Sequence, residues 1–257
     1  DQPVAGLQRQ IDLAVHGNGR VVALEERQAE LPTGVDGQRV GDAQVRRDGH
    51  HGDAWQIWGD DRYLDAAIEG MSQPDAIAAV VQAVRIPVEV GGGVRRLADA
   101  RQLRELGVER VIFGTAAVSR PEEVQAAVSH FPEAVAVAID ARDGRVAVAG
   151  WNETTDVDAQ ELAATVEGWG VVRVQFTDIR RDGTLVGPNL EAIEALGRKT
   201  GLRITAAGGV SDVRDLVRLA ELEPFGVDEA IVGKALYEGR VTLAGARLAL
   251  AEGEATR

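Results

Sequence analysis

Two aspartates each follow a run of apolar and β-branched residues. Asp140 comes directly after the segment 135–139, and Asp178 follows the segment 174–177. Such runs predict buried strands, and the catalytic residues of parallel α/β barrels gather at the carboxyl ends of strands. Two carboxyl groups whose pKa values are pushed apart can divide the donation and removal of a proton. The pattern indicates acid–base chemistry, with a helix cap or a turn as the alternative for either aspartate alone.

Two pairs of glycines form the second group of candidate residues. Gly92-Gly93 and Gly208-Gly209 each follow an apolar run, and glycine lets backbone N–H groups approach an oxyanion closely. After an amphipathic segment and another apolar run, each pair is followed by Gly114-Thr115 or Gly233-Lys234. A single pair could simply form a tight turn. The matched recurrence predicts two phosphate-binding corners and a substrate with a phosphate at each end.

Three further motifs have a functional and a plainer interpretation. The segment 182–184, which includes Gly183, predicts either a loop that closes over a ligand on a glycine hinge or an ordinary turn. Trp151 could stack on a flat heterocycle or pack in the interior. His50-His51 has no third ligand at a suitable spacing, so we expect no metal site.

An alternation of strands and helices must position these residues. Apolar runs predict strands, and apolar spacings of three and four predict the helices between them. Alternation of this kind predicts an α/β fold with a parallel sheet, and the duplicated glycine pattern predicts a (β/α)8 barrel with two similar halves. The expected strands cover residues 63–64, 88–90, 110–113, 135–139, 171–177, 203–206 and 229–232, and the expected helices cover residues 97–106, 121–128, 158–167, 189–196, 213–222 and 243–251.

The composition bounds the class of protein. The chain has 257 residues, which suits one barrel domain of about 250 residues. Hydrophobic residues make up 45% and aromatic residues only 4%, so small aliphatic side chains must fill the core. Because there is no cysteine, disulfides and thiolate sites are excluded. A formal net charge of −13 argues against a nucleic-acid partner and leaves local backbone N–H groups to attract an anionic ligand.

Membrane insertion and secretion are not expected. The sequence has no apolar run near 18 residues and no charged-then-apolar signal pattern. We therefore expect a cytoplasmic protein, and a monomer.

Residues 1–63 differ in composition from the rest of the chain. They are rich in Gln, Arg, Asp, Gly and His and have only two apolar runs, at 11–15 and 21–24. We expect a single barrel domain over residues 1–257, in which residues 1–63 are either a divergent first βα unit or not native barrel sequence. A shift of reading frame upstream of residue 64 is one hypothesis for the abrupt change.

Several motifs from residue 64 to about residue 245 occur in the order found in a known family. The block 177–185, Thr-Asp-Ile-Arg-Arg-Asp-Gly-Thr-Leu, is much more specific than any glycine pair. Together these motifs resemble the ProFAR isomerases of histidine biosynthesis. The other segments that carry the resemblance are 64–67, 88–95, 114–117, 139–144, 150–151, 187–189 and 232–236.

The resemblance implies a (β/α)8 barrel that acts without a metal or an organic cofactor. The family rearranges an aminoaldose to an aminoketose, an Amadori rearrangement, in phosphoribosylformimino-5-aminoimidazole carboxamide ribotide, which has a phosphoribosyl group at each end. Asp178 matches the family's general acid, and Asp140 and Thr177 match residues that assist or orient. The resemblance places one phosphate at Gly92, Gly93, Gly114 and Thr115 and the other at Gly209, Gly233 and Lys234.

The general base of the resembled family is an aspartate on the first strand, in an Ile-Asp-Leu context. Asp12 stands in those three letters and is the expected base, although the internal repeat projects Asp140 back to the apolar residues 21–24. Three alternatives stay open, namely a non-catalytic or defective phosphosugar-binding barrel, the sister cyclase, and a dual isomerase that also uses phosphoribosylanthranilate. The segments 177–179 and 187–189 favour the isomerase over the cyclase, and Ala149 disfavours the dual enzyme.

Overall fold

The computed structural model describes residues 15–16, 20–21, 55–57, 74–83 and 88–255. The predicted base Asp12, the pair His50-His51 and the expected strand at 63–64 lie outside the described residues. Within the described part of the chain, strands and helices alternate as the sequence predicts.

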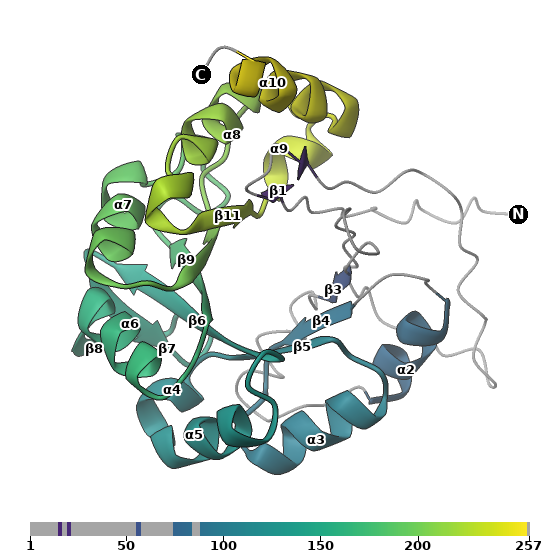
Figure 1. Cartoon of the computed structure of the whole chain (residues 1–257), viewed down its shortest axis with the longest axis vertical. Coiled ribbons are helices and arrows are strands. Elements are labelled where there is room, and N and C mark those ends of the chain that lie inside the picture. Colours follow the sequence, from purple (N-terminus) through teal and green to yellow (C-terminus); the bar gives the residue numbers. More distant parts are fainter. Residues whose placement is uncertain (1–14, 17–19, 22–54, 58–73, 84–87, 256–257) are drawn as a thin grey trace, which may run out of the picture.

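The main sheet of the described chain is built around parallel strands that curl about a common interior (Figure 1). Their order is β11-β10-β9-β6-β5-β4-β3, and helices lie on the outer side of the curl. This arrangement confirms the predicted (β/α)8-type fold. The parallel strands are β3 (Trp55–Ile57), β4 (Val88–Gly91), β5 (Arg110–Phe113), β6 (Val135–Arg142), β9 (Arg173–Asp178), β10 (Arg203–Ala207) and β11 (Val227–Ala230).

The helices that the sequence predicts are all present, with ends that differ by one to four residues. Three others, α2, α4 and α9, are additional; α4 and α9 have four residues each, too few to show a helical period. None of the described helices is long and apolar enough to cross a membrane. The helices are α2 (Pro74–Ala83), α3 (Leu97–Glu105), α4 (Ala116–Ser119), α5 (Pro121–His130), α6 (Ala159–Gly168), α7 (Leu190–Lys199), α8 (Val213–Ala220), α9 (Lys234–Tyr237) and α10 (Leu243–Ala255).

The last strand begins earlier than the sequence predicts. Residues 229–232 were the expected strand, but β11 starts at Val227. Gly226, with φ of 90°, ends the short 3₁₀ turn η1 (Glu223–Phe225), and Val227 pairs at once with Ile204 of β10. The glycine turn therefore sets where the strand starts.

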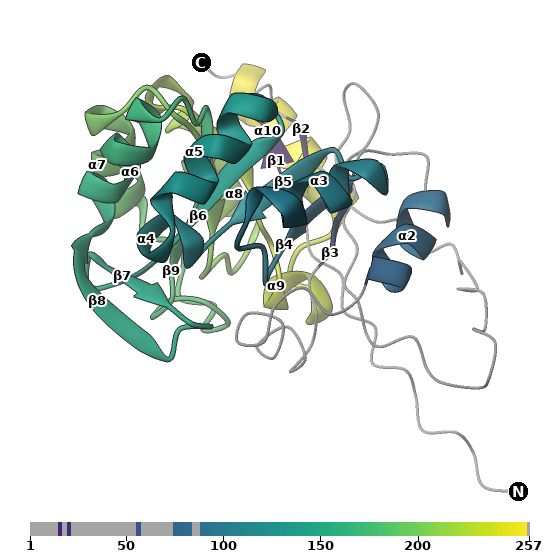
Figure 2. The same ribbon diagram turned by 90° about the horizontal axis from the view of Figure 1, so that it is seen from below.

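Two short hairpin strands extend the sheet beyond the barrel. β7 (Arg145–Val148) pairs antiparallel with the end of β6, and β8 (Glu153–Asp158) pairs antiparallel with β7. Figure 2 shows this hairpin standing away from the helices. A second antiparallel pair joins β1 (Val15–His16) and β2 (Arg20–Val21), and β1 lies beside β11 (Figure 1).

Polar side chains line part of the barrel interior. Arg110 of β5 lies 3.4 Å from Glu229 of β11, although β6, β9 and β10 separate these strands in the sheet. An ion pair between such strands must cross the interior, so both side chains point inward. Arg173 of β9 joins the group at 3.0 Å from Glu229. The next residue along each strand faces the helices, and these buried positions are apolar: Val111, Val174, Ala230.

The two glycine corners share a local structure. After the first glycine pair, Asp99 Oδ2 accepts the Arg95 N–H at 2.9 Å; after the second, Asp215 Oδ2 accepts the Ser211 N–H at 2.9 Å. Each donor lies four residues before its acceptor, and each acceptor lies in the first turn of a helix, α3 or α8. This equivalence supports the predicted internal repeat.

Candidate active site

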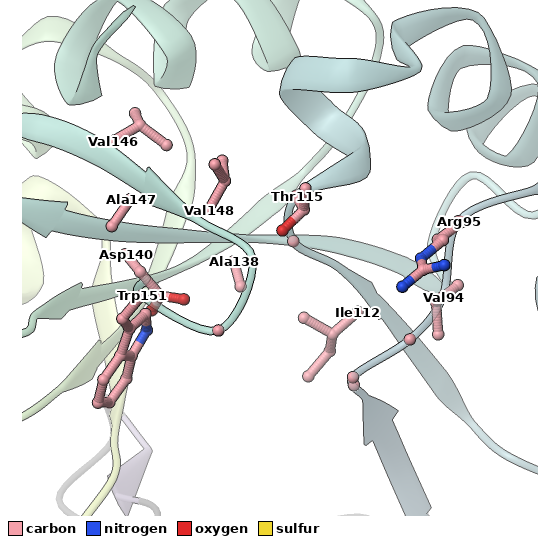
Figure 3. A pocket seen from close by; sticks show the side chains of 15 residues that line it. Val94, Arg95, Ile112, Thr115, Ala138, Asp140, Val146, Ala147, Val148 and Trp151 are labelled. Atoms are coloured by element: carbon pink, nitrogen blue, oxygen red, sulfur yellow. The ribbon is translucent and has the colours of Figure 1, made fainter. Parts of the chain in front are cut away.

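The carboxyl ends of β4, β5 and β6 enclose a cavity of 330 Å³ (Figure 3). Gly92, Gly93, Gly114 and Thr115 line it together with Asp140 and Trp151. Figure 3 shows Asp140 and Trp151 across the cavity from Arg95. The carboxyl ends of barrel strands are where this fold places its chemistry, and a cavity of this size suits part of a small ligand. The structure thus brings together six of the predicted site residues in one place.

Asp140 is the carboxyl group of this cavity. Burial raises its pKa above the usual range of an aspartate, because the charged form loses its hydration. Hydrogen bonds with the Trp151 and Thr177 side chains act in the opposite direction and lower the pKa, but by less. The position therefore favours a protonated carboxyl at a higher pH than water would allow.

Thr177 is positioned by the sheet itself. It pairs in register with Asp140 across β9 and β6, and paired residues of parallel strands point to the same face. The Thr177 side chain is buried, with only 4% of its surface exposed, and it lowers the pKa of Asp140. The orienting role of Thr177 stays a prediction.

Asp178 lies on a different face from these two residues. Because side chains alternate along a strand, the residue after Thr177 points away from the cavity and toward the helices. Asp178 Oδ2 accepts a hydrogen bond from the side-chain amide of Asn189 at 2.7 Å, and Asn189 is the N-cap residue of α7. Asp178 does not line the cavity that contains Asp140.

Further contacts tie the Asp178 carboxylate to the turn that follows it. Its Oδ1 accepts the Arg180 N–H at 3.0 Å, and its Oδ2 lies 3.8 Å from Arg181 Nε. Its backbone oxygen accepts the N–H groups of Arg181 and Asp182. Both carboxylate oxygens thus have partners in or beside the turn, so this geometry suits an anchor for the turn. The acid role of Asp178 stays a prediction.

The second glycine corner is covered by this same turn. A Cβ atom on Gly209 would lie 2.4 Å from the Gly187 carbonyl oxygen, and one on Gly208 would lie 3.0 Å from the Asp178 carbonyl oxygen. The Gly187 N–H also donates to the Gly209 carbonyl oxygen at 2.9 Å. Close approach of this backbone therefore already requires glycine at both positions, whether or not a phosphate binds there.

The remaining predicted residues lie near the second corner. Gly233 is the N-cap residue of α9, and Lys234 begins that helix with its side chain 51% exposed and Nζ 3.8 Å from Glu238 Oε1. Gly183 is exposed, with φ of 68° and no atom within 4 Å of the place where a Cβ would be. The positive φ fits the predicted glycine turn. The phosphate contacts of these residues stay predictions.

Two contacts of the site were not expected from the sequence. The Ala149 N–H donates to Thr115 Oγ1 at 3.0 Å, which links the β7–β8 hairpin to the first corner. Arg142 donates to the Trp151 carbonyl oxygen at 3.2 Å. Residues 149–151 have three positive φ angles in succession, and only glycine at 150 signals such a turn in the sequence.

No metal centre was expected, and the described residues contain no group of three or more His, Cys, Asp or Glu side chains that could hold a metal ion. The polar side chains at the cavity are one carboxyl, one hydroxyl, one indole and the Arg95 guanidinium, among glycine backbone and aliphatic side chains. Such groups can donate protons and hydrogen bonds to an anionic ligand.

The chain is similar to known proteins over most of its length. A family model described as "Histidine biosynthesis protein" matches residues 63–242. A protein of Pelotomaculum thermopropionicum, named 1-(5-phosphoribosyl)-5-((5-phosphoribosylamino)methylideneamino) imidazole-4-carboxamide isomerase, is 50% identical over 192 residues, 74% of each chain. A protein of the same name from Desulfosudis oleivorans is 46% identical over 194 residues, 75% of this chain and 77% of that one.

A third relative extends the similarity along the chain. The protein of the same name from Syntrophotalea carbinolica is 44% identical over 242 residues, 92% of this chain and 96% of its own. An alignment of that length necessarily includes part of residues 1–63.

Proposed function

The chain belongs to the histidine biosynthesis protein family, and from this membership we propose that it catalyses the reaction for which its relatives are named. It is an isomerase of histidine biosynthesis that converts the aminoaldose end of a phosphoribosyl imidazole carboxamide to an aminoketose. The reaction moves hydrogen within one molecule, so it needs no external oxidant. It needs a group that donates a proton and a group that removes one.

The substrate's phosphoribosyl groups would bind at the two glycine corners. One phosphate is placed against the backbone N–H groups of Gly92 and Gly93 and beside Gly114-Thr115, at one side of the 330 Å³ cavity. The other is placed at Gly209, Gly233 and Lys234. The turn 181–187 packs against Gly209 on the side where a Cβ would lie, so this corner needs glycine there.

We assign proton donation to Asp140. Opening of the ribose ring requires a proton on the ring oxygen, and burial favours the protonated form of this carboxyl. Removal of the C2 proton from the resulting imine then gives an enolamine, which tautomerises to the aminoketose. Asp12 stays the proposed base; it lies outside the described residues.

Asp178 takes a supporting role in this proposal. Its carboxylate anchors the turn that carries Asp182, whose backbone lies over the second corner, with Cα 3.5 Å from the place of a Cβ on Gly208. Asp182 is exposed at this edge of the barrel and is a second carboxyl group near the mouth. Substitutions at Asp178 and at Asp182 can separate anchoring of the turn from proton donation.

The observation that carries the proposal is the Asp140 carboxyl inside the cavity formed by the first glycine corner. The test is an assay of the purified full chain with the bisphosphorylated substrate, with product formation followed by chromatography. We expect conversion to the aminoketose. A folded protein that binds this substrate but never converts it would support the non-catalytic phosphosugar-binding barrel instead. Parallel assays with phosphoribosylanthranilate and with the cyclase substrate test the other two alternatives.

We further propose that the chain acts as one barrel domain and as a cytoplasmic monomer. A single continuous hydrophobic core spans the described elements from α2 to α10, which supports one domain. A phosphorylated biosynthetic intermediate is a cytoplasmic substrate. Light scattering of the purified protein should give the mass of one chain of 27.3 kDa.

A further inference from the structure

Three successive residues at the tip of the β7–β8 hairpin have left-handed backbone conformations. The φ angles are 52° for Ala149, 61° for Gly150 and 70° for Trp151. Only glycine adopts this region freely, so the alanine and the tryptophan are held there at a cost. Residues with such strain persist only where several surrounding contacts hold them in that conformation, and they gather at functional sites. We call residues 149–151 the elbow.

Contacts from outside the elbow hold it in place. Thr115 Oγ1 accepts the Ala149 N–H at 3.0 Å, and Arg142 donates to the Trp151 carbonyl oxygen at 3.2 Å. The Arg142 guanidinium is itself fixed by a 3.0 Å hydrogen bond to Thr154 Oγ1. The result is that the Trp151 indole lies beside Asp140 in the wall of the cavity (Figure 3). The elbow therefore places the indole against the cavity carboxyl.

Thr115 is the one residue of these contacts that also belongs to the first glycine corner. It follows Gly114 at the end of β5 and lines the cavity, as Figure 3 shows together with Asp140 and Trp151. Its oxygen accepts from Ala149, which leaves its hydroxyl proton to be donated. Among the residues that the structure describes, no atom accepts that proton in a hydrogen bond.

A phosphate in the first corner would complete a chain of hydrogen bonds. The phosphate oxygen accepts the Thr115 O–H, and the Thr115 oxygen accepts the Ala149 N–H. Donation by a hydroxyl polarises it and makes its oxygen a better acceptor, so the two bonds strengthen each other. Binding of the anion would then tighten the hold on Ala149 and on the strained elbow.

We propose that Thr115 is a positioning residue that couples phosphate binding in the first corner to the Trp151–Asp140 contact. The coupling rests on the proposed function, because it requires a phosphate at this corner. Through it, the substrate's phosphate end contributes to the chemical step as well as to binding. Loss of the Thr115 hydroxyl should lower kcat by about tenfold or more, with a smaller effect on KM.

The experiment uses the full chain labelled with 5-fluorotryptophan, in which Trp151→Phe assigns the ¹⁹F resonance of Trp151. Inorganic phosphate is titrated into the wild type, Thr115→Val and Thr115→Ser, with sodium chloride at matched ionic strength as the blank. Phosphate binding to each protein is measured separately by calorimetry. We expect phosphate to shift the Trp151 resonance in the wild type and in Thr115→Ser but not in Thr115→Val. Thr165→Val, which removes a hydroxyl on the far helix α6, should behave as the wild type.

The outcomes separate the coupling from the proposed function. If Thr115→Val binds phosphate and its Trp151 resonance still shifts as in the wild type, the coupling is wrong while the phosphate corner stands. If Thr115→Ser fails to restore the shift, the hydroxyl is not the link and the proposal is overturned. If the wild type binds no phosphate, the corner itself is wrong, and the coupling is lost with it.

Discussion

Thr177 and Asp140 occupy paired positions of two parallel strands, β9 and β6, and their side chains point to the same face of the sheet. Both are placed by the backbone ladder of the sheet, so their relative position does not depend on a loop. Burial raises the Asp140 pKa, and the Thr177 hydroxyl lowers it by a smaller amount. The pair therefore sets how readily the carboxyl of the cavity holds a proton.

Replacement of Asp140 by Asn should reduce turnover strongly. The amide has nearly the same shape but cannot donate a proton to the ring oxygen, and general acid catalysis typically contributes about 10²–10⁴-fold. We expect kcat to fall by that factor while KM changes little, measured by steady-state kinetics with the bisphosphorylated substrate. Asp143→Asn is the matched control, because Asp143 lies on the same hairpin with its side chain 59% exposed and paired only with Arg180. Equal activity of Asp140→Asn and the wild type would remove Asp140 from the chemistry.

Removal of the Thr177 hydroxyl should move the pH profile. If Asp140 donates the proton, turnover falls as pH rises through its pKa. The Thr177 hydrogen bond lowers that pKa, so Thr177→Val should raise it and shift the falling limb of kcat to higher pH. Thr177→Ser retains the hydroxyl and should leave the limb in place. An unchanged limb in Thr177→Val would mean that another group sets the profile.

The raised pKa of Asp140 also predicts how stability depends on pH. Below the ordinary aspartate value of 3.8, the carboxyl is protonated in both the folded and the unfolded chain. As pH rises above that value, the unfolded chain ionises first, so the free energy of unfolding falls until the raised pKa is passed. The Asp140→Asn variant has no carboxyl group at this position, so its free energy of unfolding does not fall with pH for this reason. Its stability relative to the wild type should therefore increase from acidic to neutral pH in urea unfolding, and a constant difference across that range would contradict the pKa direction.

Much of this arrangement follows from the sequence because local patterns specify it. Apolar runs such as 135–139 identify strands whatever their partners, and Asp158 marks the start of α6 as its N-cap, accepting the Gln160 and Glu161 N–H groups. The glycine pairs identify turns with positive φ, which all four glycines adopt. These features depend on a few neighbouring residues, and a single sequence contains them.

The face on which a side chain lies depends on strand register, and no local pattern specifies it. Asp178 and Asp140 look equivalent in sequence, since each ends an apolar run. The pairing of Asp140 with Thr177 places Asp178 on the opposite face, next to Asn189. The hairpin tip was unexpected for a similar reason, because Ala149 and Trp151 are held left-handed by contacts with Thr115 and Arg142 that lie far away in the sequence.

Asparagine variants at the two aspartates of the 178–182 turn separate proton donation from anchoring. If Asp178 anchors the turn, Asn189→Ala should reduce turnover because it removes the 2.7 Å contact, and Asp178→Asn should also reduce it because an amide offers one acceptor oxygen where the carboxylate offers two. Asp182→Asn should reduce turnover without loosening the turn. Steady-state kinetics is combined with limited proteolysis of residues 178–188, which should become susceptible in the first two variants only. Full activity in Asn189→Ala with none in Asp178→Asn would favour Asp178 over Asp140 as the acid.

Glu229 should contribute far more to stability than an exposed glutamate does. Its carboxylate lies 3.0 Å from Arg173 and accepts the Thr205 hydroxyl at 2.6 Å, all at buried positions. Burial disfavours the charged Arg173, but Glu229 and Asp228 outweigh this and raise its pKa. Glu229→Gln removes one of the negative charges that lie beside the buried Arg173 guanidinium. It should therefore lower the free energy of unfolding by about 3 kcal/mol. Glu238→Gln, which breaks only exposed ion pairs, should change it by less than about 1 kcal/mol in the same urea titration. Similar losses in both variants would show that the interior ion pairs do not hold the two sides of the barrel together.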